Sequence, residues 1–103
     1  MNININDLKL QIKFSAAGIE EIMQNIKTLF TTPVGTVPFD RDFGIDFSIL
    51  DLPVLQAKAK LTIEYIEKVK KYEPRVRVTE VTFEANQEGT LNPKVVIDLV
   101  GNG

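Results

Sequence analysis

The feature that most constrains the fold is a helical pattern that ends at a proline and continues directly into a strand. Apolar residues recur at helical spacing up to Tyr72, and the chain then reads Glu73-Pro74-Arg75 before a β-branched run from Val76 to Phe83. Proline cannot donate a backbone hydrogen bond, and its ring disfavours helical backbone in the residue before it. The sequence therefore predicts a helix, a sharp corner at Glu73, and a strand that leaves the corner at once.

The corner places an acid and a base together. Glu73 and Arg75 are two residues apart in extended chain, so their side chains are expected to lie on the same side of the backbone. One interpretation is a helix stop with a local ion pair, and the other is a contact surface for a partner. The residues alone leave both interpretations open.

Composition narrows the possible functions. The 103 residues include no cysteine and no histidine, and 12 basic and 14 acidic residues give a net charge of −2. Disulfides, thiolate zinc sites and histidine-based acid–base chemistry are therefore excluded. The charge balance gives no general attraction to nucleic acid or to anionic membranes. We expect one domain, residues 1–103, with no metal, cofactor, catalytic residue, nucleic acid or small-molecule substrate.

Neither a secretion signal nor a membrane span is recognisable. The first seven residues contain no basic segment and no apolar run, unlike a signal peptide. No apolar stretch approaches the roughly 18–20 residues that a membrane span needs. We expect the protein to be made and folded in the cytoplasm, without a membrane partner.

The N-terminal part predicts a strand followed by a helix. Strict alternation of apolar and polar residues from Leu8 to Phe14 is typical of a half-buried strand. Ser15 is a candidate N-cap for a helix whose apolar residues recur every three or four positions from Ile19 to Phe30. Pro33 ends this helix.

Residues 31–50 form a long connection that contains prolines and glycines and yet is rich in apolar side chains. Long connections without regular structure are often functional in compact domains. We expect the aromatic side chains of this segment, Phe39 and Phe43 among them, to be buried, either inside the chain or against a neighbouring protein.

Acidic residues of the same segment fall at the offsets of a calcium-binding loop. Ile45 stands where that loop needs glycine, and Asp51 stands where it needs a longer, bidentate glutamate. We interpret these aspartates as turn and cap residues.

A second helix is predicted after Asp51, which can serve as its N-cap with Pro53 in the first turn. Two adjoining apolar rows give this helix a wide stripe, which is expected to cover a sheet. The rows comprise Leu55, Ala59, Ile63 and Ile66, and Val54, Ala57, Leu61, Tyr65, Val69 and Tyr72. The lysines on the rest of the helix are interpreted as a solvated face, with docking of an acidic partner as the alternative.

Two further strands complete the predicted fold. The apolar positions change from even to odd between Val78 and Val81, which predicts a bulge near Thr79-Glu80. Turn residues lead to a last strand from Lys94 to Val100, expected to lie beside the first strand. We expect an α+β class: two helices packed on a small, mostly antiparallel sheet with a C-terminal hairpin.

The last strand lacks a clear alternation. Val95 to Val100 is nearly continuous apolar chain, which indicates a strand covered on both faces or paired with another molecule. A small sheet also has edges with unpaired backbone groups, to which a partner can add a strand. We expect the last strand and the segment Leu8–Phe14 to be these edges, with Val95, Ile97 and Leu99 contacting a partner.

Three motifs occur in order along the chain. They are Thr31-Thr32-Pro33-Val34-Gly35, Asp42-Phe43-Gly44 and Glu73-Pro74-Arg75-Val76. With these motifs and the helices around them, the chain resembles the baseplate wedge family of contractile phage tails, the GPW type with a lysozyme-like label, over roughly residues 16–100. This family also includes TssE of type VI secretion and small baseplate proteins of tailocins and other contractile injection particles.

The resemblance implies a structural role. Family members join a wedge protein at the inner ring of the baseplate and present a platform on which the tail sheath polymerises. Their sheet is similar to the interlocking domain of the sheath, in which strands are shared between subunits. The resemblance thus implies a virion or particle location, wedge and sheath proteins as partners, and partner contact at Glu73, Pro74 and Arg75. The lysozyme-like label leaves a peptidoglycan-hydrolysing enzyme as the alternative.

Overall fold

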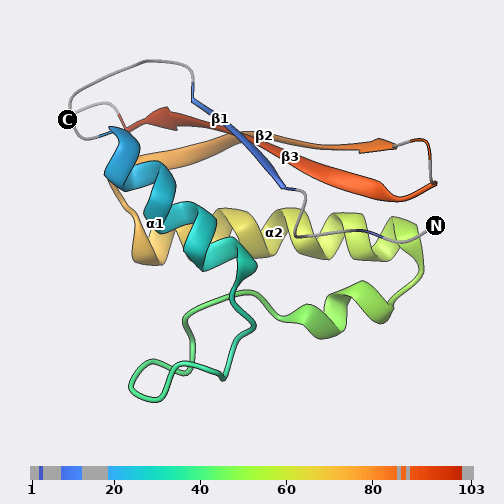
Figure 1. The fold of residues 1–103 in the computed structure, drawn as a ribbon, viewed down its shortest axis with the longest axis horizontal. Helices are drawn as coiled ribbons and strands as arrows, with labels where there is room; N and C mark the ends of the chain where they lie inside the picture. Colours follow the sequence, from blue (N-terminus) through green and yellow to red (C-terminus); the bar gives the residue numbers. More distant parts are fainter. Residues whose placement is uncertain (1–2, 4–7, 13–18, 86, 88, 101–103) are drawn as a thin grey trace.

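The computed structural model describes residues 3, 8–12, 19–85, 87 and 89–100 and has an α+β fold (Figure 1). The elements are β1 (Lys9–Ile12), α1 (Ile19–Thr31), the 3-10 helix η2 (Phe47–Asp51), α2 (Val54–Tyr72), β2 (Val76–Ala85) and β3 (Leu91–Leu99). The predicted class, two helices on a small sheet, is confirmed. Ser15 and Phe14, the predicted cap and strand end, lie outside the described residues.

The sheet has the strand order β1-β3-β2. β2 and β3 form the predicted C-terminal hairpin, and β1 lies parallel to β3 along four residue pairs that begin at Lys9 and Lys94. The last strand therefore lies beside the first, as expected. The prediction that the last strand is an edge is wrong, because β3 lies between two strands of the same chain. The edges among the described strands are β1 and β2.

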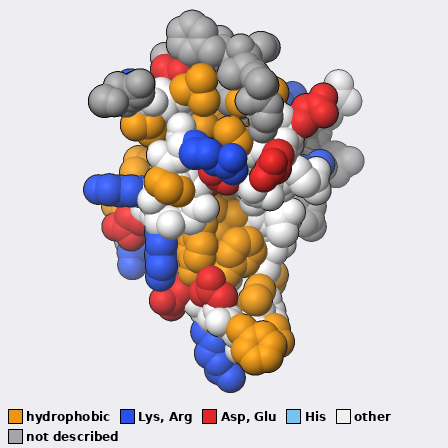
Figure 2. All heavy atoms as spheres, turned by 90° about the vertical axis from the view of Figure 1, so that its left-hand side faces the viewer, with side chains coloured by type: hydrophobic (Ala, Val, Ile, Leu, Met, Phe, Trp, Pro, Cys, Tyr) orange, Lys and Arg blue, Asp and Glu red, His pale blue; other side chains and the backbone are white. Residues whose placement is uncertain are grey.

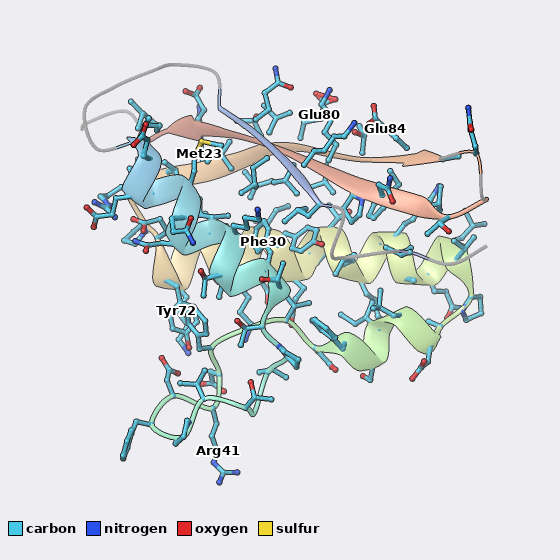
Figure 3. All side chains as sticks on the ribbon, viewed as in Figure 1. Met23, Phe30, Arg41, Tyr72, Glu80 and Glu84 are labelled. Atoms are coloured by element: carbon cyan, nitrogen blue, oxygen red, sulfur yellow. The ribbon has the colours of Figure 1, made fainter. Side chains whose placement is uncertain are left out.

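Only one face of the sheet is covered by helices (Figure 1). Val95 and Ile97 of β3 are buried on this face, and Val96 between them is only half-buried. Val96 pairs with Glu80, whose side chain points away from the helices (Figure 3). Within the described chain, the prediction of a strand covered on both faces is therefore wrong. The missing alternation in the sequence comes from an apolar residue on the outer face.

The core fills the space between the sheet and the two helices. One apolar row of α1 and one of α2 are buried there, and the Phe30 ring stacks on Tyr65 with 4.2 Å between centroids. The second apolar row of α2 is not covered. Leu55 is 77% exposed and Ile66 is 44% exposed. The wide stripe was thus predicted correctly as a pattern, but three strands and α1 cover only one side of it.

Of two local predictions, the β-bulge in β2 and the N-cap of α2, one is confirmed and one is wrong. The predicted bulge is confirmed, because the register of β2 and β3 shifts between Val78 and Glu80. The predicted cap Asp51 is wrong: it ends η2, and Pro53 is the N-cap residue of α2 without a side-chain cap. The aspartate that does cap a helix is Asp46, whose carboxylate accepts from Ser48 N at 3.0 Å. The interpretation of this segment's aspartates as cap residues is thus confirmed for Asp46.

The connection between α1 and η2 is a loop with a closed neck. Ile45 N donates to Thr32 O at 2.8 Å, and Val34 N donates to Ile45 O at 2.9 Å. Gly44 directly precedes Ile45 with φ +112, and a Cβ built on it would come within 2.3 Å of Thr32 O. Glycine at 44 is therefore required both by the backbone conformation and by the close approach of the two sides of the neck.

Replacing Gly44 tests this neck. Gly44→Ala adds a side chain where the backbone has positive φ and no space, so we expect the free energy of unfolding to fall by at least about 2 kcal/mol. Gly35→Ala is the matched control, since its φ is +89 but nothing lies within 4 Å of the added Cβ. We expect it to cost about 1 kcal/mol. Urea denaturation measures both, and equal losses would contradict a crowded neck.

The hydroxyl of Tyr65 offers a test of the core. This oxygen is buried and has no hydrogen-bond partner among the described residues, and burial raises the pKa of the phenol. Tyr65→Phe keeps the ring and removes a buried polar group, so we expect the free energy of unfolding to rise by on the order of 1 kcal/mol. Tyr72→Phe serves as the control. The Tyr72 hydroxyl donates to Asp40 Oδ1 at 2.8 Å, so its removal should not raise the free energy of unfolding. A loss of stability in Tyr65→Phe would show that its hydroxyl has a partner.

Candidate docking site at the charged corner

The corner between α2 and β2 has the geometry that the proline predicts. α2 ends at Tyr72, and Glu73 leaves the helical conformation as predicted, but with φ −139 and ψ 68 it is not fully extended, and its N–H still donates to Val69 O at 2.8 Å. β2 begins at Val76. We call residues Glu73-Pro74-Arg75 the elbow.

The acid and the base of the elbow form a two-pronged ion pair. Arg75 Nε donates to Glu73 Oε1 at 2.5 Å, and Arg75 Nη2 donates to Glu73 Oε2 at 2.9 Å. Asn25 of α1 also donates to Glu73 Oε2, at 3.3 Å. The side chain of Glu73 is 6% exposed, whereas that of Arg75 is 51% exposed. The local pair is therefore confirmed: the acid is buried and held by two elements, and the base reaches the surface.

The hydrogen bonds of Glu73 determine its ionisation. The bond from Arg75 lowers the pKa of Glu73 below its ordinary value of 4.5, and the bond from Asn25 adds to this effect. Burial acts in the opposite direction but does not prevail. The same pair raises the pKa of Arg75, so both groups are charged at neutral pH.

A groove of about 460 Å³ lies next to the elbow, between α2 and β2. The described residues that line it are apolar or basic: Ile66, Lys70, Pro74, Val76, Arg77, Val78 and Val100. β2 pairs only with β3 in the described part of the chain, so this groove follows an unpaired strand edge. We call it the β2-edge groove. Val100 N donates to Arg75 O at 3.0 Å, which ties one wall of the groove to the elbow.

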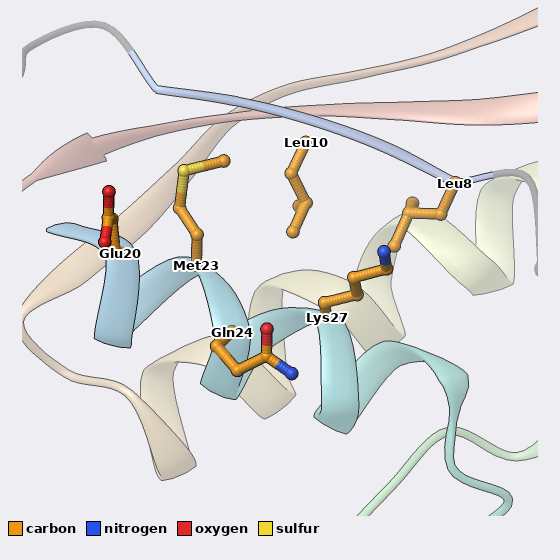
Figure 4. A pocket seen from close by; sticks show the side chains of 6 residues that line it. All are labelled: Leu8, Leu10, Glu20, Met23, Gln24 and Lys27. Atoms are coloured by element: carbon orange, nitrogen blue, oxygen red, sulfur yellow. The ribbon is translucent and has the colours of Figure 1, made fainter.

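The other edge of the sheet has a groove of different character. It measures about 330 Å³ and lies between β1 and α1 (Figure 4). Leu8, Leu10 and Met23 provide its apolar surface, and Glu20 and Lys27 place charges of both signs around it. Both open edges thus lie beside a helix, but of the two sets of described lining residues only that of the β2 edge is purely basic and apolar.

The residues predicted from the last strand are distributed differently from expectation. Val95 and Ile97 lie in the chain's own core, so the expectation that they present their side chains to a partner is corrected. Leu99 is half-buried and pairs with Val76, next to the elbow. Sequence reasoning did not single out Ile66 or Val100 as site residues. The available signal was a helical stripe too wide for a small sheet.

The two aromatic residues predicted in the long connection have different environments. Phe43 is half-buried and meets Tyr72 edge-on, with 5.2 Å between ring centroids. Phe39 is 101% exposed, so the expectation that it is buried inside the chain is wrong. Burial of Phe39 against a neighbour, the other alternative, stays a prediction.

Three of the described carboxylates have pKa shifts opposite to the shift of a glycosidase general acid. Asp42, Asp46 and Glu73 have lowered pKa values, caused chiefly by hydrogen bonds from Lys71, Ser48 and Arg75. A general acid for glycoside cleavage needs the opposite shift. No group of three or more acidic residues that could hold a metal ion occurs in the described ranges. None of the helices there is long and apolar enough to cross a membrane.

Comparison with solved structures shows first that the fold is similar to that of chains in two baseplate structures. It is similar to a chain in the cryo-EM structure of the postcontracted pyocin R2 baseplate, with a TM-score of 0.71 and 22% identity over 84% of this chain and 89% of that chain. It is also similar to a chain in the baseplate of the anti-feeding prophage, with a TM-score of 0.69 and 21% identity over 84% of this chain and 73% of that one. No curated protein matches the sequence.

The family is established by the sequence itself. Residues 16–102 match the family described as "Baseplate wedge protein gp25", and the chain belongs to this family. The resemblance seen in the three motifs is therefore confirmed.

The lowered pKa of Glu73 predicts a dependence of stability on pH. An acid whose pKa is lower in the folded than in the unfolded state stabilises the fold above about pH 4.5, and this contribution is lost as the pH falls through the folded-state value. We expect Glu73→Gln to lower the melting temperature at pH 7, and the difference from wild type to shrink on acidification. Thermal melts from pH 7 to pH 3 measure this.

Glu84→Gln is the matched control for that series. Glu84 forms an exposed ion pair with Lys9 at 3.7 Å, and such pairs contribute little to stability. We expect its melting temperature to follow wild type across the series. A gap between wild type and Glu73→Gln that is the same at pH 3 and pH 7 would contradict the role given to this carboxylate.

Proposed function

We propose that this protein is a structural, non-enzymatic part of the baseplate of a contractile tail or injection particle. In this proposal it docks on a wedge protein and gives the first sheath ring a strand edge on which to assemble. The observation that carries the proposal is the unpaired edge of β2, with the β2-edge groove and the elbow beside it. Membership of the baseplate wedge protein gp25 family and the similarity to two baseplate chains support it.

The edge of β2 offers a partner two kinds of contact. An added strand would pair with the unpaired backbone groups of β2, which supplies affinity independent of sequence. Its side chains on one face would enter the β2-edge groove, where Ile66 and Val100 are nearly half exposed. Burying these apolar surfaces would stabilise the complex further.

β2 is a better candidate for this role than β1. It has 10 residues against four in β1, and its groove is larger. Among the described residues that line the β2-edge groove, the charged ones are Lys70 and Arg77. They favour a segment that combines apolar residues with acids, because opposite charges attract at a partly desolvated contact.

The elbow supplies a second contact, which we assign to the wedge protein. Two of the N–H groups of Arg75 are bound by Glu73, and an arginine has five. Half of the Arg75 side chain is exposed, and Pro74 beside it is also exposed. In this arrangement the buried Glu73 positions the guanidinium, and the outer N–H groups of Arg75 bind a carboxylate or carbonyl of the partner.

A peptidoglycan hydrolase is not supported by the same observations. Its mechanism requires a carboxyl group kept protonated near neutral pH, facing a second one across a substrate cleft. The carboxyl groups of Asp42, Asp46 and Glu73 have lowered pKa values. We therefore assign the chain no reaction.

A charge placed in the β2-edge groove tests the proposed function. Ile66→Lys puts an ammonium group where a partner strand would cover it. Burying an unpaired charge is costly, so we expect particles with assembled sheath to decrease about tenfold or more. Electron microscopy of particles from cells that produce only the variant measures this.

Leu55→Lys is the matched control for this experiment. It introduces the same lysine side chain at another exposed apolar position of α2, outside the groove. Because both positions are exposed, both variants should keep a melting temperature close to that of wild type. Normal sheath in Ile66→Lys, or equal loss in both variants, would refute the proposed role of the groove.

A further inference from the structure

The loop between α1 and η2 carries a fully exposed aromatic side chain. Phe39 is 101% exposed, more than any other large hydrophobic residue among those described. Pro38 before it and Arg41 after it are exposed as well. A phenyl ring exposed to this degree loses the favourable transfer from water that a buried ring gains. The contacts of the loop determine whether Phe39 can turn back onto the chain.

The loop is held open by its own backbone hydrogen bonds. Above the closed neck, Gly35 N donates to Arg41 O at 2.9 Å. Asp40 N donates to Val37 O at 3.2 Å, and Phe43 N donates to Asp40 O at 3.1 Å. These bonds define a turn around Phe39 on both sides. We call residues 37–41 the loop tip.

Side chains of α2 hold the loop from a second direction. Tyr72 donates to Asp40 Oδ1 at 2.8 Å, and Lys71 Nζ lies 3.1 Å from Asp42 Oδ2. Lys68 Nζ also donates to the backbone oxygen of Asp42. The Phe43 ring contacts Tyr72 on the same helix. The loop is thus fastened to the end of α2 that leads into the elbow, and Phe39 extends away from the chain.

These contacts leave the loop tip with one free charge. Asp40 and Asp42 are both engaged with α2, and the hydrogen bond from Lys71 lowers the pKa of Asp42. Arg41 forms no ion pair within the described part of the chain, and its side chain points outward at the end of the loop (Figure 3). Figure 2 draws the side of the molecule that is at the left in Figure 1, and it shows a hydrophobic protrusion next to a basic side chain at the lower end. The surface of the loop tip is therefore an aromatic ring beside a cation.

We propose that the loop tip is a preformed docking element for another protein. Phe39 inserts into an apolar pocket of that partner, and Arg41 pairs with a carboxylate at the rim of the pocket. Aromatic and arginine side chains are enriched at the centres of protein interfaces and account for much of their binding energy. A loop fixed in its bound conformation also loses less conformational entropy on binding.

Phe39 and Phe43 lie in the same loop and look alike in the sequence, but they have different roles in this proposal. Phe43 has a structural role within the chain, because it packs on Tyr72 and helps to fasten the loop. Phe39 is the residue that contacts the partner. The inference rests on the proposed function only in taking the partner to be another protein of the same baseplate, and it concerns a different surface from the β2-edge groove.

Substitutions at the loop tip test the inference. Phe39→Ser removes a side chain with no contacts inside the chain, so we expect an unchanged melting temperature and an amount of this protein in purified particles that falls about tenfold or more. Phe39→Tyr keeps the ring and should be incorporated within about twofold of wild type. Arg41→Glu should reduce incorporation and Arg41→Lys should not. Leu55→Ser, at another exposed position, is the control. Normal incorporation of Phe39→Ser would overturn the inference.

Photo-cross-linking identifies the partner and separates the two proposals. A benzoylphenylalanine placed at Phe39 is irradiated in purified particles, with the same residue at Leu55 as the control. We expect a cross-link from position 39 to a peptide of another particle protein that contains apolar residues and an aspartate or glutamate. Particles that contain the chain but give no such cross-link, or only a cross-link to a second copy of this chain or to lipid, overturn the loop-tip inference and leave the proposed function intact. Absence of the wild-type chain from the particles overturns both.

Discussion

The buried carboxylate of Glu73 is the interaction on which the arrangement of this protein depends. It receives hydrogen bonds from Asn25 on α1 and from Arg75 just before β2, and it belongs to the residue that caps the C-terminal end of α2. One side chain therefore fixes the positions of two helices and a strand relative to one another. A buried charge is tolerated only with such a set of partners. The same set leaves half of Arg75 exposed at the surface.

The width of the sheet is the second constraint. With three strands and helices on one face only, the sheet covers one apolar row of α2 and leaves the row that contains Leu55, Ile63 and Ile66 exposed. It also leaves β2 unpaired along its outer edge. An exposed edge and an uncovered helix row would be liabilities in a protein that works alone. In the function that we propose, a partner covers the edge of β2 together with Ile66, the residue of the exposed row that lines the β2-edge groove.

The sequence predicted the elements better than it predicted their partners. Alternation, helical periodicity and Pro74 placed both helices, the hairpin and the elbow. Of the two predicted edge strands, the segment Leu8–Phe14 is confirmed by β1, and the last strand was assigned wrongly because the apolar run around Val96 suggested coverage on two faces. Strand order depends on which strands meet across the sheet, and local pattern does not encode it. The loop aromatics show the same limit: Phe39 and Phe43 are alike in the sequence, and only contact with Tyr72 distinguishes them.

By itself, the sequence determined the class of the fold, the corner at Glu73-Pro74-Arg75 and the ordered motifs that indicate the family. These follow from backbone chemistry and from side-chain periodicity, which act over a few neighbouring residues. Only the tertiary structure decided that β3 is central, that the carboxylate of Glu73 is buried, and which apolar residues remain exposed. Burial and strand pairing depend on residues far apart in the chain, and a local pattern cannot state which surfaces another element covers.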